Sequence, residues 1–368
     1  MILSRRALFA ATTAFAWGSR AWAQQLIERS PRPQNYETPI EVFSQRITPT
    51  ESFYIRSHFD TPTIDLEKWR LTVDGLEPGQ LSLSVLLQMP HTTVEAVLQC
   101  AGNGRGMMRP RVPGVQWMRG AMGNATWRGV RLRDILARTG VGPEMKHLVV
   151  SGYDRPTLPA TPPFVRSIPI ARALDANTLV ATHMNGHPIP LAHGGPARLV
   201  VPGWVGDDWV KWLERITPSP EEAKGFFFEK GYRFPDPPGA PGEPVPPERM
   251  HPMTTLNVKS VIARPRDGAV EPIGPCTVTG VAFSNTAIKM VEVSIDGTTW
   301  KRAKLESATS PYGFRVFEAE VKLKKPGRVR ISARATDESG AVQPVDAVWN
   351  PSGYLHNAID LVEIEVRQ

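Results

Sequence analysis

The sequence predicts an α+β protein in which an irregular mixed domain is followed by an immunoglobulin-like β-sandwich. Two observations lead to this fold class. Before residue 234, strand-like runs are short, unevenly spaced and interrupted by glycine and proline, whereas after residue 252 they alternate regularly. Eight prolines fall between residues 234 and 252, where the pattern changes. We therefore expect an export signal at 1–23, a first domain at 24–234, a linker at 235–252 and a second domain at 253–368.

The N-terminus has the layout of an export signal. Arg5 and Arg6 precede a modestly apolar stretch at 8–17, and Ala21-Trp22-Ala23 supplies a small-x-small cleavage site. The paired arginines resemble a twin-arginine signal, which carries folded proteins and implies that a cofactor is inserted before export. We expect cleavage after Ala23 and a periplasmic protein. An ordinary signal for unfolded chains is the alternative.

Composition limits the function classes. With 41% hydrophobic and 21% charged residues, the chain is typical of a soluble globular protein, and no apolar run approaches the ~18–20 residues of a membrane span. Without Arg5, Arg6 and Arg20 of the signal, 40 basic side chains face 36 acidic ones, a net charge of +4. This charge suits an anionic substrate or an acidic partner. It is too weak to indicate nucleic acid binding, and no block of Lys and Arg is present.

The first domain is predicted to mix short strands with two short helices. Helical patterning covers 132–139 and 170–173, and the 36 prolines of the chain argue against long helices. Strands are predicted at 69–73, 93–98, 148–150 and 198–201. The proline-rich stretch that follows is predicted to join neither a sheet nor a helix and to form a stiff, extended linker.

The second domain is predicted to contain about seven strands in ~110 residues, which is typical of an immunoglobulin-like sandwich. Asp296-Gly297 marks a turn between two of the strands. No Cys pair and Trp brace this region, so the antibody type is excluded. Predicted strands lie at 256–261, 277–281, 290–295, 314–319, 329–334 and 361–366.

The chain has only two cysteines, Cys100 and Cys276. Two cysteines cannot supply C-x-x-C-H for covalent haem, nor a Cys-rich iron–sulfur or zinc site. In an exported protein they could form one disulfide. Cys276 follows Pro275 at the start of a predicted strand, where we expect a small buried residue.

The segment Gln99-Cys-Ala-Gly-Asn-Gly-Arg105 carries the strongest chemical signal. It places a thiol at the end of an apolar strand, followed by glycines that let the backbone approach a bulky group. A thiolate suits a soft, polarisable metal. A lone buried Cys that only packs is the alternative. Upstream, period two places Arg56 and His58 on the same face of a strand-like segment.

Five ordered motifs together resemble the molybdopterin-binding domain of the sulfite oxidase family, and the sandwich resembles the dimerisation domain of that family. The resemblance covers roughly residues 45–368. The motifs are F-x-x-R-x-H at 53–58, C-A-G-N-x-R at 100–105, M-N-G-x-P-I-P at 184–190, R-L-V-V-P-G at 198–203 and W-V-K-W-L at 209–213.

The resemblance implies roles for individual residues. Cys100 matches the thiolate ligand of molybdenum, which the dithiolene of the pterin completes, so a disulfide with Cys276 would consume the ligand. Matched to the anion pocket and active site are Arg56, Arg105, Arg315, Tyr232 and, more loosely because its spacing from the Cys is shorter by two residues, Trp117. Matched to the pterin and its phosphate are Tyr54, Ile55, Arg56, His58, Asp154, His193, Arg198, Trp209, Val210 and Lys211.

Taken singly, these residues have plainer interpretations. An isolated Arg is most often a solvated surface charge. His193 could be a structural loop histidine, Tyr232 a core residue with a satisfied hydroxyl, and Asp154 an ordinary turn residue after Gly152.

The resemblance implies a sulfite dehydrogenase, in which sulfite is oxidised to sulfate at a molybdenum–molybdopterin cofactor. Guanidinium groups suit this substrate because they bind oxyanions through paired, charge-assisted hydrogen bonds. About 30 residues separate the cleavage site from Phe53, too few for a haem domain, so we expect no haem in this chain. The expected partners are a periplasmic cytochrome c as electron acceptor and a second copy of the chain in a homodimer.

Two other functions remain open. A related molybdenum enzyme could act on another sulfur substrate, as a sulfane dehydrogenase or a methionine sulfoxide reductase, although the reductase lacks the sandwich. A non-catalytic binding module with a relic site is the second alternative, and such a module would carry no molybdenum.

Overall fold

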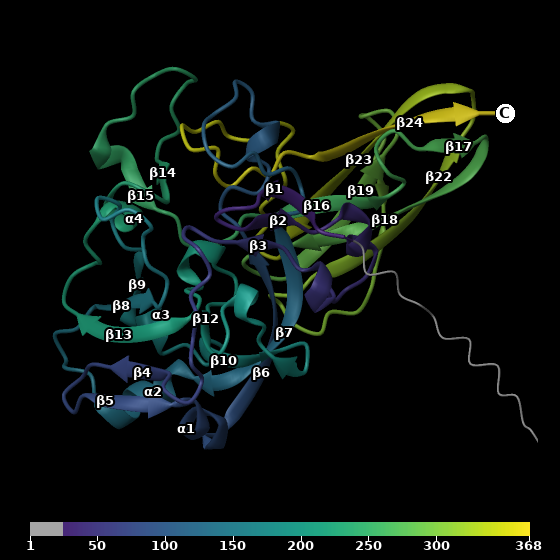
Figure 1. Cartoon of the computed structure of the whole chain (residues 1–368). Helices are drawn as coiled ribbons and strands as arrows, with labels where there is room; N and C mark the ends of the chain where they lie inside the picture. The colour runs from purple at the N-terminus through teal and green to yellow at the C-terminus, as the bar shows by residue number, and fades with distance from the viewer. Residues whose placement is uncertain (1–24) are drawn as a thin grey trace, which may run out of the picture.

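The computed structural model describes residues 25–368, so the predicted export signal at 1–23 lies outside the described residues. The first domain forms the larger lobe, and the C-terminal strands extend away from it toward the upper right of Figure 1. Within residues 25–368, no helix has both the length and the apolar character needed to cross a bilayer.

The first domain is built on three sheets. A small sheet has the order β1 (Ile27–Ser30), β2 (Asn35–Glu37), β3 (Ile55–Arg56). The central sheet has the order β11 (His187–Pro188), β10 (Leu179–Met184), β7 (Met122–Arg131), β6 (His91–Gln99), with β12 (Arg198–Val200) also paired to β10. The third sheet has the order β5 (Gly79–Ser82), β4 (Arg70–Val73), β13 (Leu213–Ser219), β8 (His147–Gly152), β9 (Val165–Pro169).

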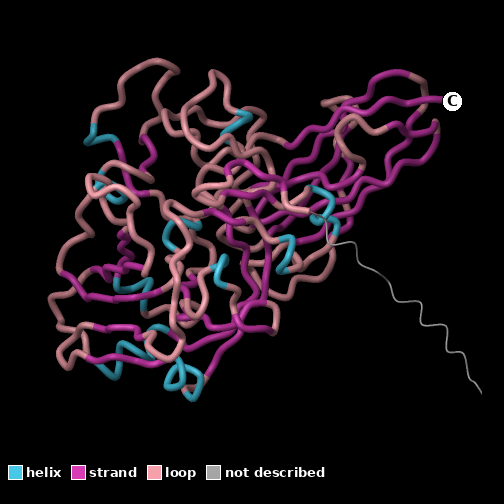
Figure 2. The backbone as a smooth tube through the Cα atoms, in the orientation of Figure 1, coloured by secondary structure: helices cyan, strands magenta, loops and turns pink. Residues whose placement is uncertain are grey.

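Helices are fewer and shorter than an α+β description suggests, and the described chain is mostly sheet and loop (Figure 2). The two helices predicted from the sequence are present with the predicted bounds. Leu132, Ile135 and Leu136 of α2 are buried because they share one face of the helix. The α-helices are α1 (Leu83–Gln88), α2 (Leu132–Thr139), α3 (Ile170–Ala173) and α4 (Phe226–Glu229).

Strand β6 delivers Cys100, and both of its edges are covered. It pairs with β7 along its whole length, from His91 opposite Val130 to Gln99 opposite Met122. On its other edge, the amide of Val97 donates to the carbonyl of Tyr312 at 2.9 Å, so the second domain closes that edge. Residues 94–99 are accordingly buried on both faces. The strand that ends at the thiol is therefore held by both domains.

The proline-rich stretch is not the extended linker that its composition predicted. Its ends form an antiparallel hairpin of β14 (Arg233–Pro235) and β15 (Met250–Pro252). A two-stranded ribbon tolerates proline because the missing N–H can face away from the partner strand. The proline-rich segment ends next to where it begins, since the amide of Met253 donates to the carbonyl of Tyr232 at 3.1 Å.

The second domain consists of two sheets that enclose one apolar cluster, to which both sheets contribute. Each of the six predicted strands is present, and Asp296 accepts hydrogen bonds from the amides of Thr298 and Thr299 in the predicted turn. One sheet has the order β16 (Lys259–Arg264), β18 (Gly274–Phe283), β22 (Arg315–Leu323), β21 (Lys304–Leu305). The other has the order β17 (Val270–Pro272), β24 (Asp360–Arg367), β23 (Gly327–Asp337), β19 (Ile288–Ser294), β20 (Lys301–Arg302).

The two domains share buried surface. Phe283 and Phe314 of the second domain belong to the same apolar cluster as Phe43 of the first, and Phe43 meets Phe314 edge to face at 5.7 Å. A partly buried ion pair crosses the same boundary, from Arg119 to the buried carboxylate of Asp360 at 3.0 Å. The domains are thus packed as one unit rather than tethered.

Acid should weaken this boundary through His356, which is buried in the second domain against Gly104 of the first. Burial, followed by the neighbouring Lys259, lowers the pKa of His356 to about 4 from 6.5. Between pH 4 and 6.5, the imidazole of His356 is protonated in the unfolded chain but neutral in the folded protein. The free energy of unfolding therefore has its full contribution from His356 above pH 6.5, and this contribution is lost as pH falls through 4. The shift corresponds to about 3 kcal/mol.

We therefore expect the melting temperature of the wild-type protein to fall more steeply between pH 6.5 and 4 than that of His356→Asn. Calorimetry of both proteins across this range makes the comparison. Other titrating groups are common to both proteins and cancel in the difference. Parallel curves would show that His356 is not buried as a neutral group.

Candidate active site

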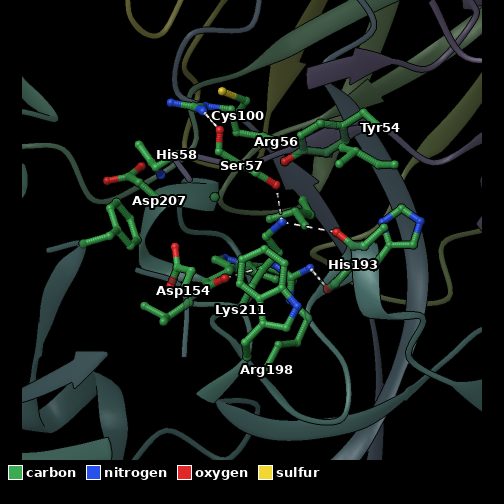
Figure 3. Close-up of a pocket in the computed structure, with 18 of the residues that line it drawn as sticks. Tyr54, Arg56, Ser57, His58, Cys100, Asp154, His193, Arg198, Asp207 and Lys211 are labelled. Carbon is green, nitrogen blue, oxygen red and sulfur yellow. Dashed lines mark hydrogen bonds between the residues drawn. The ribbon is translucent and has the colours of Figure 1, made fainter. Parts of the chain in front are cut away.

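Cys100 lies at the junction of two adjoining cavities, which share it with Arg56, His58 and Tyr232. The inner cavity extends from Cys100 past Lys211 to Arg198, which lies at the opposite end of the group drawn in Figure 3. The outer cavity is rimmed by exposed residues that include Phe226 and Lys230. It opens on the other side of the thiol. Cys100 thus lines both cavities.

A tight turn presents the thiol. The amide of Cys100 still donates to Ala121 at 2.9 Å in the ladder, and the carbonyl of Cys100 then accepts from the amide of Asn103 at 2.9 Å. The side chain of Asn103 secures the turn, donating to Gln99 at 3.0 Å and accepting from the amide of Ala121 at 3.1 Å. Gly104, with φ of 92°, completes the turn in a conformation that disfavours other residues.

Two cations wall the inner cavity: Arg198, which is buried, and Lys211, which is half-buried. Lys211 donates to Ser57 Oγ at 2.8 Å and to the carbonyl of Ala192 at 3.2 Å. Arg198 donates to the carbonyls of His193 at 2.7 Å and Trp209 at 2.9 Å, and its Nε is buried with no hydrogen-bond partner. Within residues 25–368, neither cation forms an ion pair with an acidic side chain.

The electrostatics of this wall indicate a missing negative charge. Burial, and then Arg198, lowers the pKa of Lys211 well below its usual value, although Asp154 opposes the shift. Burial lowers the pKa of Arg198 to about 10, and burial followed by Lys211 lowers that of His193 to about 4. Burying unpaired charge is costly. The inner cavity is therefore built for an anionic group, whose binding would repay the desolvation of both cations.

The outer cavity presents hydrogen-bond donors around Cys100. Arg56 and Arg105 both line it, and neither forms an ion pair within the described chain. Trp117 is fully buried in its wall, and its Nε1 has no hydrogen-bond partner. Guanidinium groups that have no acidic partner are suited to a small oxyanion.

Tyr232 joins the two cavities through His58. Its hydroxyl lies 2.5 Å from Nε2 of His58, and burial raises its pKa despite the opposing charge of Arg56. Burial, followed by Arg56, lowers the pKa of His58 well below its usual value. His58 is therefore neutral and Tyr232 remains protonated. The phenol can then donate to Nε2 or to a ligand in the outer cavity.

The donor set fits a molybdenum–pterin cofactor. Among the described residues, no group of three or more His, Cys, Asp and Glu side chains could hold a metal. A metal bound by the buried, unpaired thiol of Cys100 would thus take its remaining ligands from a bound molecule. The cations of the inner cavity are suited to that molecule's phosphate.

The structure brings together every residue predicted for the site except Arg315. His58 lines both cavities even though β3 ends at Arg56, two residues before it, and covers only part of the strand-like segment 53–59 that the sequence suggested. Cys276 is buried and unpaired, as predicted, and no disulfide joins it to Cys100.

The placement of Arg315 beside the metal is corrected. Arg315 begins β22, opposite Ala282, and lines neither cavity. Its neighbours Phe314 and Val316 both pack into the cluster shared with the first domain. Because successive side chains of a strand point to opposite faces, Arg315 projects away from that cluster. The second domain does reach the outer cavity, but through residues 351, 352 and 354.

The sequence analysis missed two groups of site residues. Asp207 lines the inner cavity, and buried Arg166 binds it at 2.7 Å and Asp208 at 2.9 Å. The adjacent acids were visible, but their partner lies in an unremarkable strand about 40 residues earlier. Tyr354 enters the outer cavity from a loop of the second domain that carries no motif.

Comparison with known proteins identifies both halves of the chain. Residues 58–227 match the family model described as "Oxidoreductase molybdopterin binding domain", and residues 250–367 match "Mo-co oxidoreductase dimerisation domain". The chain is 36% identical over 357 residues to mitochondrial sulfite oxidase of Mus musculus, covering 92% of this chain but 65% of that protein. It is 37% identical to sulfite oxidase of Gallus gallus, covering 89% and 75%. The fold is similar to the sulfane dehydrogenase SoxCD of Paracoccus pantotrophus, with a TM-score of 0.79, 27% identity and coverage of 98% and 96%.

Proposed function

Because this chain belongs to the sulfite oxidase family of molybdenum cofactor enzymes, we propose that it oxidises sulfite to sulfate. The observation that carries the proposal is the set of donors around Cys100. Two guanidinium groups without an acidic partner and a protonated phenol line one cavity beside the thiol. Such a set favours a small free dianion over a large or neutral substrate.

The residues have separate tasks. When bound, the molybdenum cofactor supplies the two-electron oxidation, in which sulfite and water become sulfate, two protons and two electrons. Cys100 holds the metal as a soft thiolate. Arg56 and Arg105 bind and orient the anion, and Tyr232 donates a hydrogen bond to it. Lys211 and Arg198 retain the cofactor by binding its phosphate.

The electrons require an external acceptor, and we propose a periplasmic c-type cytochrome. The support is the predicted export signal at 1–23 together with the absence of a haem-binding motif from the sequence. In this proposal the holoprotein folds and binds its cofactor before export, and the signal is cleaved after Ala23. We further propose that the second domain is immunoglobulin-like, since two sheets enclose its apolar cluster.

The similarity to a sulfane dehydrogenase supports one alternative, oxidation of protein-bound sulfur. Purified holoprotein should be given sulfite with ferricyanide, sulfite with cytochrome c, and a protein-bound persulfide with either acceptor. Sulfite-dependent reduction of both acceptors is expected. Reduction of ferricyanide alone would refute the proposal that a c-type cytochrome is the electron acceptor. Turnover of the persulfide alone would refute sulfite as the substrate. If the purified protein contained no molybdenum, the non-catalytic binding module would be the remaining function.

Assembly provides a further prediction. The second half of the chain matches a dimerisation domain, so we expect a homodimer of about twice 40.6 kDa, less the signal peptide. Sedimentation velocity at micromolar concentration measures the mass. A monomer at that concentration would contradict the prediction without affecting the catalytic proposal.

A further inference from the structure

One loop of the second domain, residues 349–356, is docked against the turn that carries Cys100. The amide of Leu355 donates to the carbonyl of Ala101 at 2.9 Å, and the indole of Trp349 donates to the carbonyl of Pro110 at 3.1 Å. His356 packs on Gly104, where a side chain on the glycine would collide with it at 2.7 Å. The loop thus contacts the first domain along its length, and its residues 351, 352 and 354 line the outer cavity.

The shape of this loop is fixed by its own contacts. Asn350 accepts from the amide of Tyr354 at 2.9 Å and donates to its carbonyl at 2.9 Å. Leu355 has a φ of 55°, a left-handed conformation that a branched residue keeps only when its surroundings enforce it. Asn257 helps by donating to the carbonyl of Leu355 at 2.7 Å. The loop can therefore act as a rigid support.

The residue that this loop supports is Arg105. Nε of Arg105 donates to the carbonyl of Ser352 at 2.7 Å, and its guanidinium carbon lies 5.1 Å from the centre of the Tyr354 ring. Space for the side chain is made by three glycines, at each of which a Cβ would meet Arg105 within 2.8 Å: Gly102, Gly114 and Gly353. Two of these belong to the first domain and one to the loop.

The same ring also contacts Tyr232. The rings of Tyr354 and Tyr232 stack with centroids 5.4 Å apart and planes inclined by 15°. Tyr354 therefore contacts both the guanidinium and the phenol that face the proposed substrate. A cation over an aromatic face is held by the ring quadrupole, and stacked rings restrict each other.

We propose that Tyr354 is a positioning residue of the second domain, which holds Arg105 in the orientation that binds the substrate anion. Through its ring, and with the carbonyl of Ser352, the loop fixes Nε of Arg105. Nη1 donates to the carbonyl of Val115 at 3.2 Å, so Nη2 is the nitrogen left to the anion. The inference rests on the proposed sulfite site. It assigns to the second domain a part in anion affinity that is separate from dimerisation.

The test compares Tyr354→Leu, which removes the ring, with Tyr354→Phe, which keeps it. Trp300→Leu is the matched control, because Trp300 forms a similar contact with Arg334, at 4.2 Å, on the sheet that contains β19 and β23. Sulfite kinetics with ferricyanide, molybdenum content and calorimetric affinity for sulfate are measured on each holoprotein. Sulfate affinity reports on anion binding even if sulfite is not the substrate.

Tyr354→Leu should raise KM and weaken sulfate binding by roughly three- to thirtyfold while kcat changes less, in line with the loss of one cation–π contact. Tyr354→Phe should lie closer to wild type than Tyr354→Leu, and Trp300→Leu should match wild type. In an Arg105→Gln background, Tyr354→Leu should have a much smaller effect, because the residue acts through Arg105.

Unchanged KM and sulfate affinity in Tyr354→Leu would overturn the proposal, as would equal effects with and without Arg105. Equal losses in Tyr354→Phe and Tyr354→Leu would overturn it too, since the hydroxyl would then be the acting group. If Tyr354→Leu loses molybdenum, Tyr354→Met replaces it with the same expectations. Absence of sulfite turnover in wild type refutes the proposed function, whereas the sulfate series still decides on Tyr354.

Discussion

Cys100→Ser should abolish sulfite oxidation while leaving the fold intact. The thiol is buried, unpaired and placed at the junction of the two cavities, and within residues 25–368 no cluster of three potential ligands could replace it. A hard hydroxyl is a poor substitute for a soft thiolate. The change is small in volume, so the melting temperature should stay near that of wild type.

Cys276→Ser is the matched control, because Cys276 is the other buried free thiol and lies in β18 of the second domain. It should retain full activity. Molybdenum content, sulfite turnover and melting temperature are measured for both variants. Full turnover by Cys100→Ser with normal molybdenum content would refute the assignment of the metal ligand.

Arg56→Gln and Arg105→Gln should each weaken sulfite binding strongly while the metal is retained. Both guanidinium groups line the outer cavity without an acidic partner, so each is available to an anion. Removing one charge-assisted hydrogen bond costs about 1.5–3 kcal/mol, which corresponds to about a ten- to hundredfold loss in kcat/KM. Steady-state kinetics with sulfite measure this loss, and metal analysis separates it from loss of the cofactor.

Arg315→Gln provides the comparison, because the structure places that side chain on β22, outside both cavities. Its kinetics should match those of wild type. If Arg315→Gln raised KM as strongly as Arg105→Gln, the substrate would have to reach a face of β22 that the cavities do not include. Normal kinetics in Arg56→Gln and Arg105→Gln would instead show that the substrate anion does not bind in the outer cavity.

Local patterns were enough to predict much of the fold. The helix at 132–139 was predictable because apolar residues recur at helical spacing on the face that becomes buried. The strands of the second domain were predictable because their side chains alternate between the apolar interior and solvent. The proline-rich stretch was misjudged, because the pairing of β14 with β15 joins segments on either side of the prolines and has no local signature.

By itself, the sequence determined the chemistry of the site: one thiol in a glycine-containing turn, and the ordered motifs that supply Arg56, His58, Arg198 and Lys211. Those residues lie in short contiguous segments, so their types and spacing are visible in the chain. Only the tertiary structure decided which residues of the second domain reach the site. Arg315 is turned away by the alternation of β22, and Tyr354 arrives on a loop whose position depends on contacts with residues some 250 positions earlier. Such contacts leave no trace in local spacing, because packing between domains, rather than the local chain, selects them.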